Sequence, residues 1–111
     1  MTTETLDSST LDIARMREAA DKATAVLRAL ANADRLLLLC QLSQGEMAVS
    51  DLETLLDIHQ PTLSQQLGVL RNEGLVTTRR DGKRIFYSVA DPKVLQILAT
   101  LYQLYCPSNE A

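Results

Sequence analysis

Tryptophan is absent from this 111-residue sequence, phenylalanine and tyrosine together supply only 4% of it, and glycine (4) and proline (3) are few. With 46% hydrophobic residues, such a composition favours a helical domain over a β-sandwich or a disordered chain. The longest apolar run, residues 36–40, is far shorter than the roughly 18–20 residues of a bilayer helix. The acidic, polar start also lacks the pattern of a signal peptide. We therefore expect a single cytoplasmic domain with no membrane partner.

Cysteine and histidine are equally scarce, with two and one copies respectively. Two cysteines are too few for the disulfide framework of a small secreted protein. One histidine leaves a metal site poor in ligands, so we expect no metal and no cofactor. No catalytic triad, phosphate-binding loop or paired acid cleft is visible, which predicts that the protein is not an enzyme.

The formal net charge of −3 at first argues against a nucleic-acid partner. The charges are unevenly distributed, however. Between positions 59 and 84 five basic residues face two acidic ones, whereas the rest of the chain is acidic. Because a phosphate backbone meets local charge rather than the overall balance, this segment is a candidate nucleic-acid surface.

Hydrophobic periodicity predicts two helices in the first part of the chain. Apolar residues recur at steps of three and four over 10–30, which indicates a helix with one apolar seam. A second helix follows an N-cap at Asn32 and is apolar nearly all round through residue 42, so we expect it to be buried. The domain is predicted to span 10–106, with tails at 1–9 and 107–111.

The remaining pattern predicts two more helices, a hairpin and a final helix. Ser50 is the expected N-cap of a short helix that turns Leu52, Leu55 and Leu56 inward, and a further helix over 61–72 buries Leu63, Leu67 and Leu70. The β-rich runs 75–80 and 84–89 flank Asp81-Gly82, a strong hairpin signal, and Asp91-Pro92 begins the last helix. The fold class is therefore mainly α with a β-hairpin wing, in the order α-α-α-α-β-β-α, a winged helix-turn-helix.

This arrangement predicts binding to double-stranded DNA. The polar face of the helix after Pro61 suits the major groove, and the basic hairpin suits phosphates or a narrow minor groove. The plainer interpretation is a polar surface helix beside a solvated hairpin, but the joint pattern favours DNA. The candidate DNA-binding residues are His59, Gln60, Thr62, Ser64, Gln65, Gln66, Arg71, Arg79, Arg80, Lys83 and Arg84.

Three stretches resemble the ArsR-type winged-helix repressors: Leu30-Ala-Asn-Ala-Asp-Arg-Leu, the segment 60–76 and the segment 79–89. The resemblance covers about residues 11–105. It implies a homodimer, paired through the first and last helices, that represses from an inverted-repeat operator. The dimer interface expected from the apolar stripes of those helices comprises Ile13, Met16, Ala20, Leu27, Leu98, Leu101 and Tyr105.

Metal sites known in that family are not matched here. The stretch 47–52 lacks both thiols of the third-helix metal box, and the last helix offers Asp91 but no histidine. His59 lies in the helix-turn-helix, far along the chain from either position, and is better interpreted as a residue near DNA.

Cys40 and Cys106 have two interpretations. As free cysteines they are ordinary small buried hydrophobes. Their placement, however, resembles the thiol-based subgroup of the family, the biofilm-growth and sulfide-quinone-reductase repressors (BigR/SqrR-like). That resemblance implies a redox pair that is linked by persulfide or other reactive sulfur species as inducer, releases DNA and controls sulfide detoxification genes. Arsenite or general oxidants as inducers, and a non-sensing antiactivator, remain alternatives.

Overall fold

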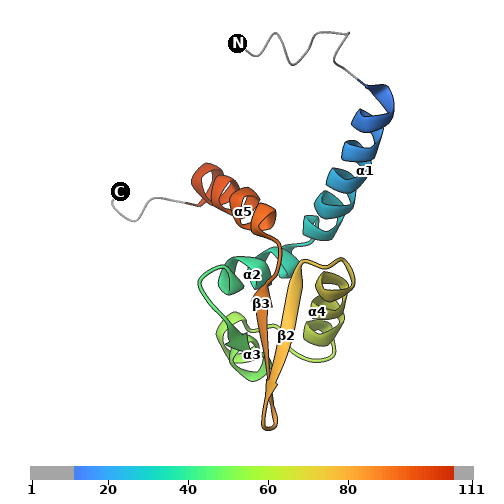
Figure 1. Cartoon of the computed structure of the whole chain (residues 1–111). Helices are drawn as coiled ribbons and strands as arrows, with labels where there is room; N and C mark the ends of the chain where they lie inside the picture. Colours follow the sequence, from blue (N-terminus) through green and yellow to red (C-terminus); the bar gives the residue numbers. More distant parts are fainter. Residues whose placement is uncertain (1–11, 107–111) are drawn as a thin grey trace.

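The computed structural model describes residues 12–106, so the tails predicted at 1–9 and 107–111 lie outside the described residues. The elements follow the order of a winged helix-turn-helix with one additional short strand (Figure 1): α1 (Ile13–Leu30), α2 (Ala33–Leu42), β1 (Met47–Ala48), α3 (Val49–Leu56), α4 (Thr62–Asn72), β2 (Val76–Asp81), β3 (Arg84–Val89) and α5 (Pro92–Tyr105). The predicted fold class is confirmed, and β1 is the strand that the sequence pattern did not indicate.

Of the two predicted N-caps, Asn32 is confirmed and Ser50 is wrong, and the last helix begins at the predicted Asp91-Pro92. The Asn32 side chain accepts a hydrogen bond from the Arg35 N–H (3.0 Å), and Asp91 accepts one from the Lys93 N–H (2.9 Å). Ser50 is not a cap, because α3 begins at Val49, directly after β1 pairs with β3, and its N-cap position is Ala48, which makes no side-chain cap bond. Pairing of the Met47–Ala48 segment therefore moves the start of α3 toward the N-terminus.

The core lies where α2, α3, α4 and the start of α5 meet the sheet. Its fully buried large side chains are Leu38, Leu39, Leu52, Leu63, Leu70, Leu75 and Val94. Leu63, Leu67 and Leu70 are buried as predicted. Leu55 is instead exposed, because α3 packs through the face that carries Leu52 and Leu56, and Leu55 is rotated away from it.

The burial of α2 also differs from the prediction of a helix buried all round. Leu38, Leu39 and Leu42 are buried, but Leu37 and Cys40 are exposed. These two residues lie about one turn apart on the side of α2 that faces α5, and they line a hollow between the two helices.

The sheet has the order β1-β3-β2 and is antiparallel throughout. In the hairpin Asp81 pairs with Arg84, so the connecting residues are Gly82 and Lys83, one position later than the predicted turn. Gly82 has φ +64°, a left-handed conformation that a residue without Cβ adopts at little cost. The register therefore presents Lys83 at the tip of the wing.

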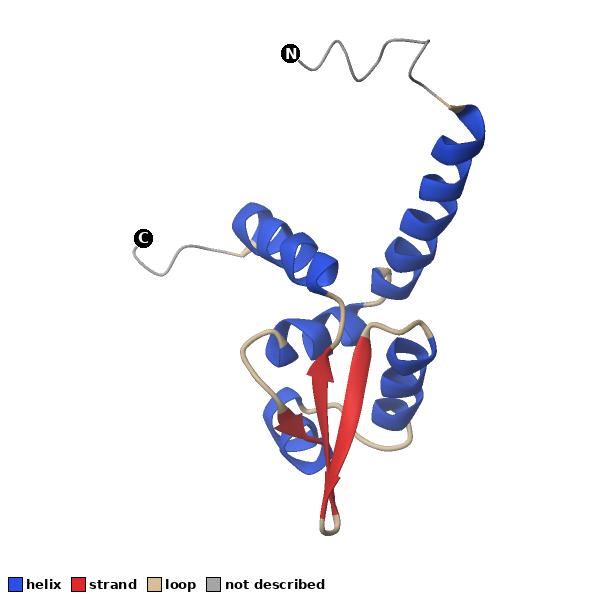
Figure 2. Ribbon diagram, in the orientation of Figure 1, coloured by secondary structure: helices blue, strands red, loops and turns tan. Residues whose placement is uncertain are grey.

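Helices α1 and α5 project from one end of the molecule, and the hairpin tip lies at the other end (Figure 2). Most of α1 is exposed, including Ile13 (69%) and Met16 (50%), as are Tyr102, Leu104 and Tyr105 on α5. Leu98, predicted at the dimer interface, belongs instead to the protomer's own core at 3% exposure, because it faces inward beside Val94. Within residues 12–106, no helix combines the length and apolarity needed to cross a bilayer.

Candidate nucleic-acid interface and thiol pair

Helix α4 presents a polar face opposite its buried leucines. Ser64, Gln65 and Arg71 are exposed, whereas Thr62 is half-buried. Gln60 precedes the helix, and its side-chain oxygen accepts a hydrogen bond from the Ser64 N–H (3.1 Å). Gln60 thus satisfies one of the free N–H groups at the start of α4, in addition to lying where DNA would approach.

Gln66 is placed differently from the other predicted DNA contacts. It is half-buried, and its side-chain oxygen accepts a hydrogen bond from Arg35 Nη1 (2.7 Å). Since this oxygen is engaged by a residue of α2, Gln66 joins two helices within the protomer.

His59 lies in the turn before α4 between two carboxylates. Its Nε2 is 2.6 Å from Asp57 Oδ1, and its Nδ1 is 3.4 Å from Glu53 Oε2. Hydrogen bonds to Glu53 and Asp57 raise the pKa of His59 above its ordinary value. The ring is exposed, and when it is protonated its charge is balanced by these two carboxylates.

The four predicted cations of the wing divide into two pairs. Arg79 forms a two-point contact with Glu46, with Nε–Oε2 at 2.7 Å and Nη2–Oε1 at 2.8 Å, and Arg84 Nη2 lies 2.6 Å from Asp51 Oδ2. The hydrogen bond with Glu46 raises the pKa of Arg79 and lowers that of Glu46. Both guanidinium groups also lie over the Phe86 ring, at 4.5 Å and 5.1 Å from its centroid.

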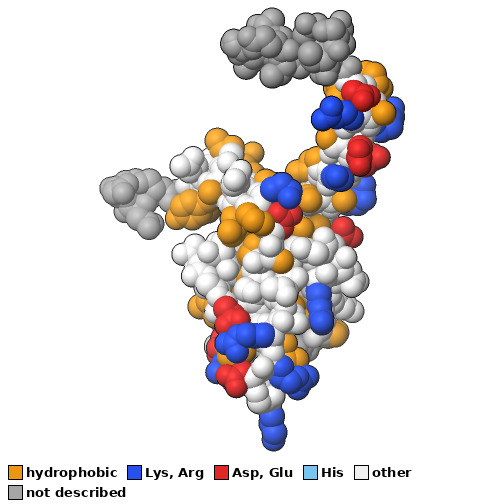
Figure 3. Space-filling view, in the orientation of Figure 1, with side chains coloured by type: hydrophobic (Ala, Val, Ile, Leu, Met, Phe, Trp, Pro, Cys, Tyr) orange, Lys and Arg blue, Asp and Glu red, His pale blue; other side chains and the backbone are white. Residues whose placement is uncertain are grey.

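The other pair, Arg80 and Lys83, is exposed near the hairpin turn and forms no salt bridge within residues 12–106. Lysine and arginine side chains mark this end of the molecule in Figure 3. Arg79 and Arg84 therefore tie the wing to Glu46 and to Asp51 of α3, and Arg80 and Lys83 are the wing cations outside these salt bridges.

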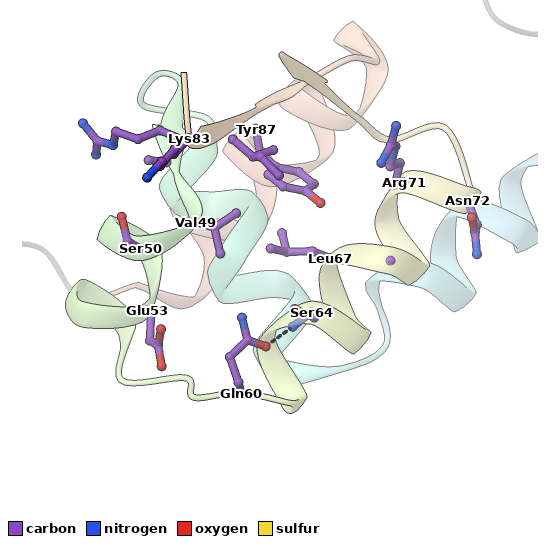
Figure 4. A pocket seen from close by; sticks show the side chains of 14 residues that line it. Val49, Ser50, Glu53, Gln60, Ser64, Leu67, Arg71, Asn72, Lys83 and Tyr87 are labelled. Carbon is purple, nitrogen blue, oxygen red and sulfur yellow. Dashed lines mark hydrogen bonds between the residues drawn. The ribbon is translucent and has the colours of Figure 1, made fainter. Parts of the chain in front are cut away.

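A hollow separates the wing from α3 and α4, with Ser64, Arg71, Lys83 and Tyr87 in its lining. Figure 4 shows the Tyr87 ring and the Leu67 side chain directed into this hollow, with Arg71 and Lys83 on opposite sides of the ring. Tyr87 was missed by the sequence reasoning. Its sequence signal is a tyrosine in the strand that follows the basic turn, next to Phe86 and therefore on the opposite face of the sheet from it.

Cys40 and Cys106 are both free and exposed. Cys106 caps the C-terminus of α5, where its N–H donates to the Tyr102 carbonyl (2.9 Å), and Tyr102 lines the α2–α5 hollow together with Cys40. Partial burial raises the pKa of the Cys40 thiol, and the charge of Cys106 raises it further. Cys40 therefore holds its proton more firmly than an ordinary cysteine does.

The structure brings together no group of three or more His, Cys, Asp or Glu side chains that could hold a metal ion in the part of the chain that it describes. The candidate functional groups are the polar face of α4, the cations of the wing and the two free thiols. A polar-faced helix beside a braced, positively tipped hairpin defines a winged helix-turn-helix DNA-binding protein.

Comparison with known proteins gives the family. Residues 27–78 match the model of the bacterial regulatory protein arsR family. The chain is 45% identical to a biofilm growth-associated repressor of Agrobacterium fabrum over 99% of this chain and 98% of that protein. It thus belongs to the arsR family and is a DNA-binding transcriptional regulator.

Two solved structures extend this similarity to the fold. The transcriptional repressor BigR from Xylella fastidiosa superposes with a TM-score of 0.80 at 42% identity, over 88% of this chain and all of that one. A homodimeric winged helix-turn-helix DNA-binding domain from Mycobacterium bovis gives a TM-score of 0.72 at 36% identity, over 81% of this chain and 83% of that one.

Proposed function

We propose that this protein is a homodimeric transcriptional repressor that occupies an inverted-repeat operator and leaves it when Cys40 and Cys106 become covalently linked. The observation that carries the proposal is the combination, in one protomer, of the polar-faced α4 with two exposed thiols at the α2–α5 junction. Cys40 lines the hollow between α2 and α5, and Cys106 is the C-cap residue of α5. The similarity to proteins named as repressors supports the direction of regulation.

The homodimer is supported by apolar surface that one protomer leaves uncovered. Hydrophobic side chains gather over α5 and along α1 in Figure 3. The two helices enclose an apolar hollow lined by Ala23, Val26, Leu27, Val94 and Ile97. A second copy would bury this surface, and the relative from Mycobacterium bovis is itself described as homodimeric.

The proposed interface between copies consists of residues of α1 and α5 that remain accessible. Apart from Leu98, the predicted set persists, and Tyr102 and Leu104 extend it. A two-fold dimer of this kind places two copies of α4 at a fixed spacing, which matches the two half-sites of an inverted repeat. The proposed set is Ile13, Met16, Ala20, Leu27, Leu101, Tyr102, Leu104 and Tyr105.

For DNA binding, the α4 residues Ser64 and Gln65 approach base edges, and Arg71 approaches the backbone. At the wing, Arg80 and Lys83 supply phosphate contacts. The Tyr87 hydroxyl, in the hollow between the wing and α4, is a further donor. His59 adds a pH-dependent charge at the turn that precedes α4.

The thiol step balances with a persulfide, RSSH, as the oxidant. Two cysteine thiols and one RSSH give a disulfide, one RSH and one hydrogen sulfide. With two RSSH, the products are a bridge with one additional sulfur, two RSH and one hydrogen sulfide. Either product would draw the end of α5 against α2. Because α2 also contacts α4, the two reading helices would lose their matched spacing, and base and phosphate contacts would weaken together.

The proposal is tested on operator DNA that the reduced protein selects from genomic fragments. Affinity for this DNA is measured before and after treatment with glutathione persulfide, hydrogen peroxide or arsenite. We expect persulfide to weaken binding by wild type and to leave Cys40→Ser and Cys106→Ser unaffected. Release by arsenite or by every oxidant would favour the corresponding alternative inducers. Unchanged binding under all three reagents would favour a non-sensing antiactivator and contradict the switch.

If persulfide is the inducer, genes of sulfide detoxification are the expected targets. The regulated promoter can be identified by sequencing the DNA that the reduced protein retains from genomic fragments. Retained fragments that lie upstream of unrelated genes only would contradict this part of the proposal.

A further inference from the structure

Arg35 connects three helices through one guanidinium group. It is the third residue of α2 and is half-buried. Its Nε donates to the Ala29 carbonyl, its Nη2 donates to the Arg28 carbonyl (3.2 Å), and its Nη1 donates to Gln66 Oε1 (2.7 Å). The last turn of α1, the first turn of α2 and the middle of α4 thus share a single side chain.

This connection is rigid because both ends of it are fixed. At the end of α1, the Arg28 carbonyl also accepts a hydrogen bond from the Ala31 N–H (3.3 Å), and the Ala29 carbonyl accepts one from Arg35 Nε. A cation is favourable at a helix C-terminus. The backbone of Arg35 is itself held by the Asn32 cap (3.0 Å). Since a guanidinium presents its donors in one plane, the end of α1 and Gln66 cannot shift independently without breaking a hydrogen bond.

Gln66 lies where a shift of Arg35 would also shift α4. It lies on α4 directly after Gln65, whose side chain is exposed on the proposed reading face, and directly before the buried Leu67. A displacement of the Gln66 side chain would therefore move α4 at the boundary between its buried face and its exposed face. No other side-chain hydrogen bond joins α4 to α1 or α2 within residues 12–106.

We propose that Arg35 and Gln66 form the positioning contact that ties the recognition helix to the α1 end of the dimerisation scaffold, and that Gln66 acts through this contact rather than by touching DNA. The inference rests on the proposed function, because it assigns the path by which the thiol switch reaches α4. Cys40 lies on the same helix, about 7.5 Å farther along its axis than Arg35. A short rigid helix that is pulled at Cys40 must also displace the guanidinium.

Matched substitutions at Gln66 test the contact. Gln66→Met keeps the length of the side chain but removes the acceptor, and Gln66→Glu keeps the acceptor and adds a charge that favours Arg35. A hydrogen bond to a charged group corresponds to roughly a 10-fold change in an equilibrium constant or more. We expect Gln66→Met to weaken operator binding of the reduced protein about 10-fold. Gln66→Glu should bind within about threefold of wild type, because the contact to the charged guanidinium is retained.

Three readouts distinguish positioning from direct contact with DNA or from general damage. Gln66→Met should leave the salt dependence of binding and the base preference unchanged, and it should reduce the ratio of affinities between the reduced and persulfide-treated states. Gln65→Met, the control on the exposed face, should instead alter base preference. In the Arg35→Met background, Gln66→Met should cost no further affinity, and thermal unfolding identifies any variant that fails to fold.

The proposal is overturned if Gln66→Met binds the operator as tightly as wild type. It is also overturned if Gln66→Glu loses as much affinity as Gln66→Met and shifts base preference, which is the signature of a direct base contact. Failure of the thiol switch is a separate result, seen as equal affinity of the reduced and treated wild-type protein. In that case the reduced-state affinities alone decide the role of Arg35 and Gln66.

Discussion

The division of the wing cations into braced and free pairs predicts two different salt dependences of DNA binding. Arg80 and Lys83 form no salt bridge within the described part of the chain, so each is available to a phosphate. Arg79 and Arg84 each already contact a carboxylate, from Glu46 and Asp51. A cation that is neutralised within the protein releases few counterions from DNA, whereas a free cation releases them in full.

The magnitude follows from the number of contacts removed. In the proposed dimer, replacing Arg80 and Lys83 by glutamine removes four phosphate contacts, which at about 0.9 per contact lowers the slope of log K against log salt by about 3.6. Between roughly 50 and 200 mM salt, wild type should then lose about 150-fold more affinity than the variant does. Replacing Arg79 and Arg84 by glutamine should lower DNA affinity by a factor that is nearly the same at every salt concentration. The slope of log K against log salt should therefore change by less than about 1.

Fluorescence anisotropy with labelled promoter DNA, repeated over a series of salt concentrations, measures both slopes. The two double variants remove the same number of positive charges from the same hairpin, so each is the control for the other. Equal slope changes in the two variants would refute the reasoning, because they would show that Arg79 and Arg84 leave their carboxylates for DNA.

Three further predictions concern protonation and stability. The pKa of His59, the only histidine, should lie above 6.5 by NMR titration and should fall toward that value in Asp57→Asn. The stabilisation of the fold by the contacts of His59 with Glu53 and Asp57 should be complete below pH 6.5 and should be lost as the pH rises through the higher pKa of the folded protein. A midpoint at or below 6.5 would contradict the contacts. Alkylation of Cys40 in the Cys106→Ser variant should have a pH midpoint that remains above the ordinary thiol value, because burial persists without the second charge; an ordinary midpoint would show that Cys40 is fully solvated. Asn32→Ala should lower the free energy of unfolding by about 1 kcal/mol in urea titrations, whereas Ser50→Ala, which removes no cap, should have little effect; equal losses would restore Ser50 as a cap.

The elements that follow from local pattern were predictable from the sequence. The leucine stripe of α4, the caps at Asn32 and Asp91 and the hairpin after Gly74 depend on residues that lie within a few positions of one another. The order of elements and the fold class follow from them. The two-residue strand β1 was not predictable, because its only cause is pairing with β3, about 40 residues away.

The placement of individual site residues depended on such distant contacts. The sequence correctly placed Arg79 and Arg84 in the wing, but their carboxylate partners lie 33 positions earlier in the chain. The half-burial of Gln66 likewise follows from Arg35, 31 positions away. Exposure of Cys40 could not be inferred from the leucine run around it, because it depends on how α5 lies beside α2.

The most direct test of the thiol switch is intact mass and operator affinity measured on the same samples of reduced protein after treatment with glutathione persulfide, peroxide or glutathione disulfide. The account predicts a Cys40–Cys106 link only after persulfide treatment, either as a disulfide or with one or more additional sulfur atoms, and weakened binding in that sample. Loss of two hydrogens with every reagent would instead define a general oxidant switch. A protein that forms no link, or that forms one and still binds its operator as before, would contradict the central claim.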